Sequence, residues 1–138
     1  MNSQITVVLA IGGRGTRFSE ISGAVPKPLF KINGTSTLER TLIELSLNGL
    51  SEIILTTCYK SEVFREFIKN IKIKFNLNIT IFEENYPMGE CGALWHIKNK
   101  LLENTLFING DLIFSIDFKK LIAFHKRLDS EITLVTHP

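Results

Sequence analysis

The residues best suited to chemistry form a glycine-rich stretch near the N-terminus. Gly12, Gly13 and Gly15 follow an apolar run, and Arg17 and Lys27 come shortly after them. Glycine lets the backbone approach a ligand closely, and its N–H groups can bind phosphate oxygens. The two basic side chains would add positive charge over a polyphosphate, and prolines on both sides of Lys27 stiffen its segment. The pattern predicts a polyphosphate site; the alternative is a glycine-rich surface loop with solvated charges.

Two common phosphate-binding motifs do not fit this stretch. A P-loop requires G-x-x-x-x-G-K-[ST], and no lysine comes directly after Gly15. A dinucleotide-binding fingerprint requires glycine or alanine at the position that Phe18 occupies. The predicted site therefore belongs to neither class.

A carboxylate lies in a comparable position later in the chain. Asp111 is the only one of three aspartates that comes directly after an apolar, strand-like run. Such a carboxylate is well placed to hold Mg²⁺ against substrate phosphates. The alternative, favoured on this residue alone, is a turn aspartate that binds backbone N–H groups. Asp117 is predicted instead to cap a helix that begins near residue 118.

A second pair of glycines, Gly89 and Gly92, flanks the start of a predicted helix. Backbone groups at this place can read the edge of a nucleobase, and small residues leave room for its plane. The alternative is an ordinary loop and helix N-terminus, where Glu90 favours the helix dipole. Both interpretations stay open at the level of the residues.

The elements that position these residues alternate along the chain. Ser36 or Thr37 is predicted to cap the first helix and Ser61 the second. Residues 12–34 are expected to form a long loop. The alternation indicates a Rossmann-like α/β fold with a mainly parallel sheet and helices on both faces. Apolar periodicity predicts strands at 5–11, 52–57, 77–83, 105–109 and 131–136, and helices at 37–48, 61–71, 90–102 and 118–128.

Length and composition narrow the function classes. The 138 residues suit one domain, 1–138, and 44% hydrophobic with 22% charged residues excludes disorder. A formal charge of +2 gives no reason to expect nucleic acid or a membrane surface as a partner. No apolar run reaches the ~18–20 residues of a membrane span. The first residues are typical of a strand and not of a signal peptide, and two cysteines fit neither a metal site nor a disulfide framework, so a reducing cytoplasm is expected.

Taken together, these stretches resemble the sugar-1-phosphate nucleotidyltransferase family. That family opens with L-A-[AG]-G-x-G-T-R followed by P-K-P-L, which residues 12–17 and 26–29 match. Residues 87–94 are similar to its P-L-G-T-A-G-A-L, and residues 109–111 match its N-G-D. The likeness runs in order along the chain and is greatest to the branch that acts on heptose or mannose 1-phosphate with GTP, or with CTP.

The resemblance implies a role for each matching residue. Arg17 and Lys27 would neutralise NTP phosphates, and Asp111 would bind Mg²⁺. The implied reaction is in-line attack of a sugar 1-phosphate oxygen on the α-phosphorus of an NTP, with release of pyrophosphate. NTP and sugar 1-phosphate would be the partners, without nucleic acid or membrane, and a homo-oligomer stays open. The implied nucleotide-binding residues are Ala10, Ile11, Gly12, Gly13, Gly15, Thr16, Gly89 and Gly92.

Some positions depart from the family pattern. Ile11 stands where the family has alanine, and the nucleoside fits only if this side chain turns into the core. Glu90 stands where the family has threonine; its carboxylate either accepts from a guanine or balances the helix end. The family's sugar pocket and second metal-binding aspartate lie beyond Pro138, so we expect the nucleotide-binding half alone. A fragment of a longer enzyme, a broken gene product and a short non-catalytic nucleotide-binding module all remain open.

Overall fold

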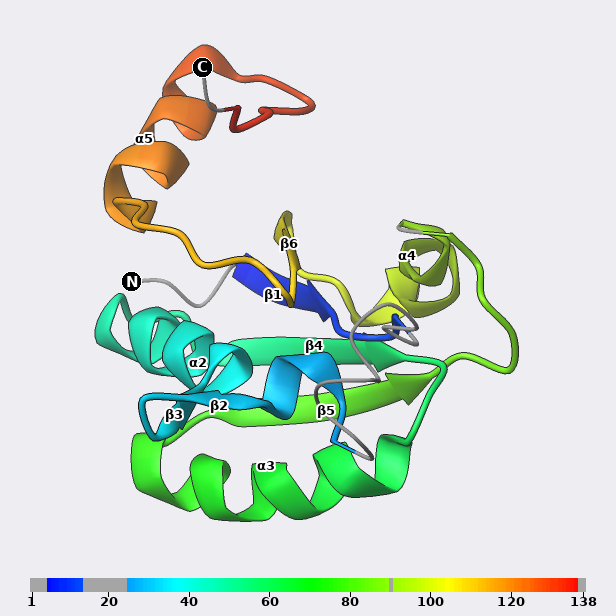
Figure 1. Ribbon diagram of the computed structural model, residues 1–138. Helices are drawn as coiled ribbons and strands as arrows, with labels where there is room; N and C mark the ends of the chain where they lie inside the picture. The colour runs from blue at the N-terminus through cyan, green and yellow to red at the C-terminus, as the bar shows by residue number, and fades with distance from the viewer. Residues whose placement is uncertain (1–4, 14–24, 90, 137–138) are drawn as a thin grey trace.

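A single parallel sheet organises the protein. The computed structural model describes residues 5–13, 25–89 and 91–136. Within these residues, the sheet has the strand order β5-β4-β1-β6, with β1 between β4 and β6 (Figure 1). This arrangement confirms the expected Rossmann-like fold. The strands are β1 (Ile5–Ala10), β4 (Glu52–Thr57), β5 (Asn78–Glu83) and β6 (Asn104–Asn109).

Strand β1 is buried on both faces. Val7 and Leu9 are fully buried in the larger apolar core, whereas Val8 is fully buried in a smaller cluster. Successive side chains of a strand point to opposite faces, so the two clusters lie on opposite sides of the sheet. A strand buried in this way has an almost unbroken apolar sequence, which is why the sequence located β1 to within one residue.

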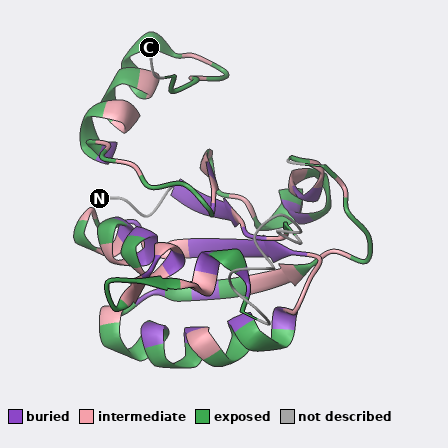
Figure 2. Cartoon of the chain, viewed as in Figure 1, coloured by how far each residue is buried: buried purple, intermediate pink, exposed green. Residues whose placement is uncertain are grey.

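Helices cover both faces of the sheet, as predicted. On the side of the larger core lie α2 (Thr37–Leu47) and α3 (Ser61–Phe75), whose apolar stripes are the buried part of each helix (Figure 2). On the other side, α4 (Gly92–Ile97) packs Ile97 against Val8. None of the helices in the described part of the chain has the length and apolar character needed to cross a bilayer.

Two of the three predicted helix caps are confirmed. The backbone N–H of Glu39 donates to the hydroxyl of Ser36 at 3.2 Å, at the start of α2. The N–H of Lys120 donates to the carboxylate of Asp117 at 3.0 Å, at the start of α5 (Phe118–Leu128). These contacts satisfy N–H groups that have no partner within the helix.

The third cap prediction is wrong. The residue before α3 is Lys60, in the left-handed region with φ of 52°, and it provides no side-chain cap. Ser61 is the first residue of the helix itself, and its hydroxyl binds the carboxylate of Glu83 at the end of β5. The Ser61 hydroxyl, which the local pattern assigned to the helix end, thus hydrogen-bonds instead to Glu83, a residue distant in the sequence.

Three segments differ in detail from the sequence prediction. The helix predicted at 61–71 is longer, because α3 continues to Phe75. The expected helix 90–102 is shorter, because α4 ends at Ile97 and a 3-10 helix, η2 (Lys98–Lys100), follows it. The expected loop 12–34 contains a one-turn 3-10 helix, η1 (Lys27–Leu29), and the first strand of a small hairpin, β2 (Lys31–Ile32) with β3 (Thr35–Ser36). Its turn is Asn-Gly with both residues at positive φ, a sequence signal for this hairpin that the loop prediction overlooked.

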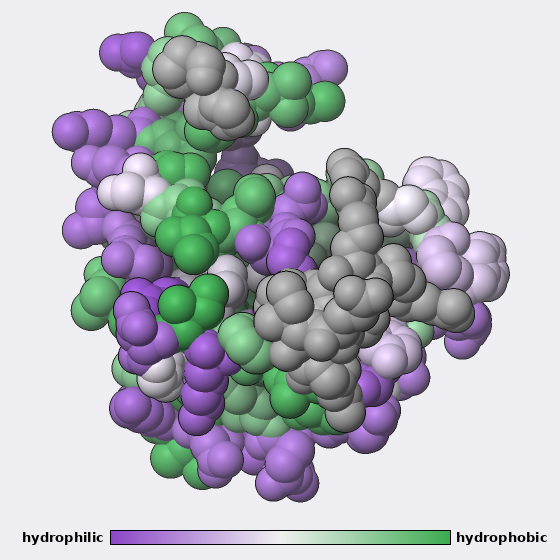
Figure 3. Space-filling model, in the orientation of Figure 1, coloured by the Kyte–Doolittle hydropathy of each residue, from purple (hydrophilic) through white to green (hydrophobic). Residues whose placement is uncertain are grey.

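The predicted strand at 131–136 is wrong. None of the described strands pairs with this segment, which follows α5 on the side of β6 away from β1 (Figure 1). Ile132, Leu134 and Val135 are 76%, 82% and 57% exposed, and apolar side chains gather on the surface near the C-terminus (Figure 3). The alternating sequence suits one face of a sheet, but a strand forms only where a neighbour takes its backbone hydrogen bonds.

Replacement of Thr6 by valine tests how the sheet holds the connection before β6. The Thr6 hydroxyl is buried and accepts the N–H of Leu102 at 2.9 Å. We expect Thr6→Val to lower the free energy of unfolding by about 1–2 kcal/mol, because it removes this acceptor without changing the side-chain shape. The same change at the exposed Thr80 of β5 is the control, measured by urea unfolding. Equal effects at both positions would contradict the assigned role of the Thr6 hydroxyl.

Candidate functional site

The glycine-rich stretch and the N-G-D stretch lie next to each other. The chain runs from β1 to β4 and β5 on one side and then crosses to β6 on the other, so the order reverses between β1 and β6. Ligands of open α/β sheets bind at this point, beyond the carboxyl ends of the strands. The two ends are tied together there, because the N–H of Gly110 donates to the carbonyl of Ala10 at 2.8 Å.

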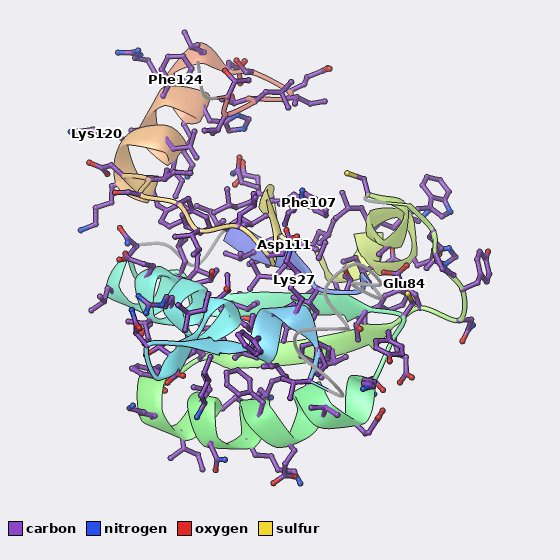
Figure 4. All side chains as sticks on the ribbon, viewed as in Figure 1. Lys27, Glu84, Phe107, Asp111, Lys120 and Phe124 are labelled. Carbon is purple, nitrogen blue, oxygen red and sulfur yellow. The ribbon has the colours of Figure 1, made fainter. Side chains whose placement is uncertain are left out.

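Two predicted site residues, 84 positions apart, meet at this edge. The ammonium of Lys27 lies 2.7 Å from Oδ2 of Asp111 (Figure 4). The 3-10 turn η1 holds the backbone of Lys27, whose carbonyl accepts the N–H of Phe30 at 3.2 Å. The two side chains are 44% and 45% exposed, so the ion pair contributes at most about 1 kcal/mol to stability. The pair therefore matters for where it places a cation and a carboxylate.

Gly12 fits closely against the end of β4. A Cβ at this position would lie 3.1 Å from both the backbone nitrogen of Cys58 and Cα of Thr57. The thiol of Cys58 also donates to the Gly12 carbonyl, at 3.1 Å. In contrast, a Cβ at Gly13 would have no atom of the described residues within 4 Å. Gly12 thus packs closely against the end of β4, whereas no described residue limits the space for a side chain at Gly13.

Ile11 turns into the core. Its side chain is 3% exposed within the larger apolar cluster, and its N–H donates to the carbonyl of Thr56 at 2.9 Å. This is the orientation that leaves room for a nucleoside at the carboxyl end of β1. A contact from Ile11 to a nucleotide would have to use its backbone carbonyl, because its N–H and side chain are already engaged.

Two further glycines of the predicted site, Gly89 and Gly92, shape the connection between β5 and α4. Glu84 closes this loop, because its carboxylate accepts the N–H of Met88 at 3.2 Å while its own N–H donates to Thr57 at 2.7 Å. Gly89 has a φ of 76°, and a Cβ at Gly92 would lie 2.6 Å from Cβ of Met88. Loop geometry therefore requires both glycines, whether or not a base binds beside them.

The last residue of β5 is an ionised carboxylate that faces α3. The pKa of Glu83 lies below its ordinary value, chiefly because the Ser61 hydroxyl donates to it and then because Arg65 binds it. The guanidinium of Arg65 lies 3.2 Å from Oε2 of Glu83. This carboxylate therefore links β5 to α3.

The structure does not describe every residue of the predicted site, and it shows two residues whose contacts there were not predicted. Gly15, Thr16, Arg17 and Glu90 lie outside the described residues. The contact of Cys58 with Gly12 was not predicted, because the sequence search for ligand-binding residues covered the ends of three strands and not the end of β4. The same rule, applied to every strand, would have found it. Glu84 lay within a searched stretch, but no sequence signal marks a carboxylate that closes its own loop.

Mg²⁺ fits this edge as an ion that a protein carboxylate and a substrate phosphate would bind together. No group of three or more His, Cys, Asp or Glu side chains gathers anywhere in the described ranges. Mg²⁺ at phosphate sites needs only one or two carboxylates, with water and phosphate oxygens completing its six ligands. The half-exposed carboxylate of Asp111 is suited to this role. The donor chemistry thus matches a metal held jointly by the protein and a bound polyphosphate.

Comparison with known proteins identifies a family. The model of the nucleotidyl transferase family matches residues 5–138. A mannose-1-phosphate guanylyltransferase of Mycobacterium tuberculosis is 31% identical over 133 residues, which cover 95% of this chain and 36% of that protein. The chain therefore spans about a third of the length of the curated relatives it matches.

Solved structures extend the comparison. HddC of Yersinia pseudotuberculosis, solved in complex with GMP-PN, is 34% identical with a TM-score of 0.70, over 87% of this chain and 53% of that one. The inositol-1-phosphate CTP transferase of T. maritima is 18% identical with a TM-score of 0.64, over 80% of this chain and 44% of that one. At this lower identity the likeness concerns the fold alone.

Alanine substitutions at the two neighbouring glycines test the close fit of the β1 end. Neither glycine has a left-handed φ, so the backbone of each accepts alanine. We expect Gly12→Ala to lower the free energy of unfolding by about 1–3 kcal/mol, because the added methyl meets the backbone of β4. Gly13→Ala should change it by less than about 0.5 kcal/mol. Urea unfolding of both variants measures the difference, and equal values would refute the assigned packing.

Proposed function

Because this chain belongs to the nucleotidyl transferase family, we propose that it forms the NTP-binding part of a sugar-1-phosphate nucleotidyltransferase. The proposed reaction transfers the nucleotidyl group of an NTP to a sugar 1-phosphate and releases pyrophosphate. The observation that carries the proposal is the contact between Lys27 and Asp111 at the point where the strand order reverses. One group suited to phosphate and one suited to a metal lie side by side there.

Each residue of the pair has a distinct proposed role. Lys27 binds phosphate oxygens as a positive charge on a flexible stem. Asp111 holds Mg²⁺, which when bound supplies Lewis-acid polarisation of the phosphoryl group. Gly12 and Gly13 allow the backbone to approach the triphosphate, and Arg17 adds a second positive charge. Phosphoryl-group transfer needs mainly orientation and charge stabilisation, which these groups provide.

The proposed nucleotide is GTP. Support comes from the Mycobacterium tuberculosis relative, which is named for guanylyl transfer, and from the HddC structure, which contains GMP-PN. Mannose 1-phosphate is the sugar substrate that the relatives' names favour. A direct titration with GTP, CTP, UTP and dTTP in the presence of Mg²⁺ tests the base, and we expect GTP to bind most tightly.

Turnover is tested separately from binding. A coupled assay would measure pyrophosphate released from GTP and mannose 1-phosphate by the 138-residue chain. Release that depends on both substrates supports a complete active site. GTP binding without release supports a non-catalytic nucleotide-binding module or part of a larger enzyme. Absence of Mg²⁺-dependent binding of any NTP would contradict the proposed function.

The role of Asp111 is tested by replacement with asparagine. We expect Asp111→Asn to lose about tenfold or more of the GTP affinity that Mg²⁺ adds, because it removes the charged ligand of the metal. Affinity for GTP in EDTA should change much less. Asp129→Asn is the matched control: this aspartate ends α5 in the left-handed region, which asparagine also adopts readily. Isothermal titration with and without Mg²⁺ gives both affinities.

The outcome distinguishes a metal ligand from a turn residue. If Asp111 only stabilises its turn, Asp111→Asn should leave the Mg²⁺ dependence of GTP binding at the wild-type value. A loss of equal size in Asp129→Asn would point to a general effect of charge. Either result would contradict the proposed metal role.

A further inference from the structure

Lys27 forms an ion pair with Asp111, the carboxylate that the proposed function assigns to the metal. Its ammonium is 2.7 Å from Oδ2 of Asp111, which makes a direct ion pair. We propose that Lys27 is a place-holding cation, which weakens the binding of divalent metal to Asp111 until a nucleotide's phosphates draw the ammonium away. This inference rests on the proposed function and adds an order to it: nucleotide binding prepares the metal site.

The anchoring of Lys27 permits such an exchange. Its backbone belongs to the 3-10 turn η1, where the carbonyl of Pro26 accepts the N–H of Leu29 at 2.9 Å. The next residue, Pro28, is buried. In contrast, the lysine side chain is 44% exposed and ends four flexible carbons from Cα. The turn therefore fixes the origin of the side chain while its ammonium can move from Asp111 to a phosphate.

Electrostatics make the two states exclusive. An ammonium and a divalent cation close to the same carboxylate repel each other, so the metal binds fully only after Lys27 leaves. The triphosphate of an NTP has several charged oxygens, whereas Asp111 has a single carboxylate. The ammonium of Lys27 therefore binds the triphosphate in preference to Asp111. Metal and nucleotide then bind with positive coupling, and linkage requires each to tighten the other by the same factor.

The strength of the competition follows from the exposure of the pair. Exposed ion pairs contribute little, and their free energies convert to a factor of about two to five in an equilibrium constant. Removal of the ammonium should therefore tighten the binding of metal alone by about two- to fivefold. The structure thus points to a modest bias against metal binding and not to a closed site.

Mn²⁺ binding without nucleotide tests the proposal directly. Free Mn²⁺ is counted by electron paramagnetic resonance during titration of the wild-type chain and of variants at Lys27. We expect Lys27→Gln to bind Mn²⁺ about two- to fivefold more tightly. Lys27→Arg, which keeps the charge, should bind it as weakly as the wild type. The added affinity should vanish in the double variant with Asp111→Asn.

A second lysine provides the matched control. Lys31 is exposed on β2, four positions after Lys27, and lies opposite Ser36 of β3 in the hairpin. Lys31→Gln changes the net charge by the same amount and should alter Mn²⁺ affinity by much less than Lys27→Gln. Equal tightening in the two variants, or no tightening in Lys27→Gln, would overturn the proposal.

A nucleotide titration separates this inference from the proposed function. GTP should bind Lys27→Gln more weakly than wild type, because a phosphate-binding charge is lost. The factor by which GTP tightens Mn²⁺ binding should also fall. If Asp111→Asn removes the metal dependence of GTP binding while Lys27→Gln leaves Mn²⁺ affinity unchanged, the proposed function stands and the place-holding role fails. If Asp111→Asn has no effect, both fail.

Discussion

The position of β1 between two parallel neighbours is the constraint on which the rest of the structure depends. Backbone hydrogen bonds tie its end to both neighbours, from Ile11 to Thr56 of β4 and from Gly110, just after β6, to Ala10. These bonds fix where the chain leaves the sheet after β1 and after β6. The glycine at position 12 is a consequence, because β4 lies too close to its Cα for a side chain to fit without movement.

This rigid origin explains how two side chains from distant parts of the chain meet. Asp111 follows β6 by two residues, and the bond between Gly110 and Ala10 holds that turn against β1. Lys27 reaches the same place from η1, a turn whose Pro28 is buried. Functional groups on loops gain precision when a scaffold fixes both ends of the loop. Here the scaffold fixes the backbones, and the half-exposed side chains keep freedom to exchange partners.

The sequence predicted best what local burial and local hydrogen bonds decide. Strand β1 was found because burial on both faces leaves an almost wholly apolar sequence. The cap of α2 was narrowed to Ser36 or Thr37 because a helix cap needs only the next three residues. Prediction failed where a distant partner decides. Ser61 binds Glu83 and not its own helix end, and the alternating residues 131–136 have no paired neighbour among the described strands. Periodicity describes a segment's faces but not its partners.

The candidate site divides in the same way. Residue types alone suggested that Lys27 suits phosphate and that Asp111 suits either a metal or a turn, and only the sheet order brings them to one place. Their partial exposure has a physical consequence for the proposed chemistry. Water around a half-exposed ion pair screens the attraction between its charges. A bound triphosphate would displace that water and so strengthen the electrostatic interactions among Lys27, Asp111, the metal and the phosphates. The nucleotide would thereby complete the electrostatics of the site that receives it, which is why metal and nucleotide should bind as coupled ligands and not independently.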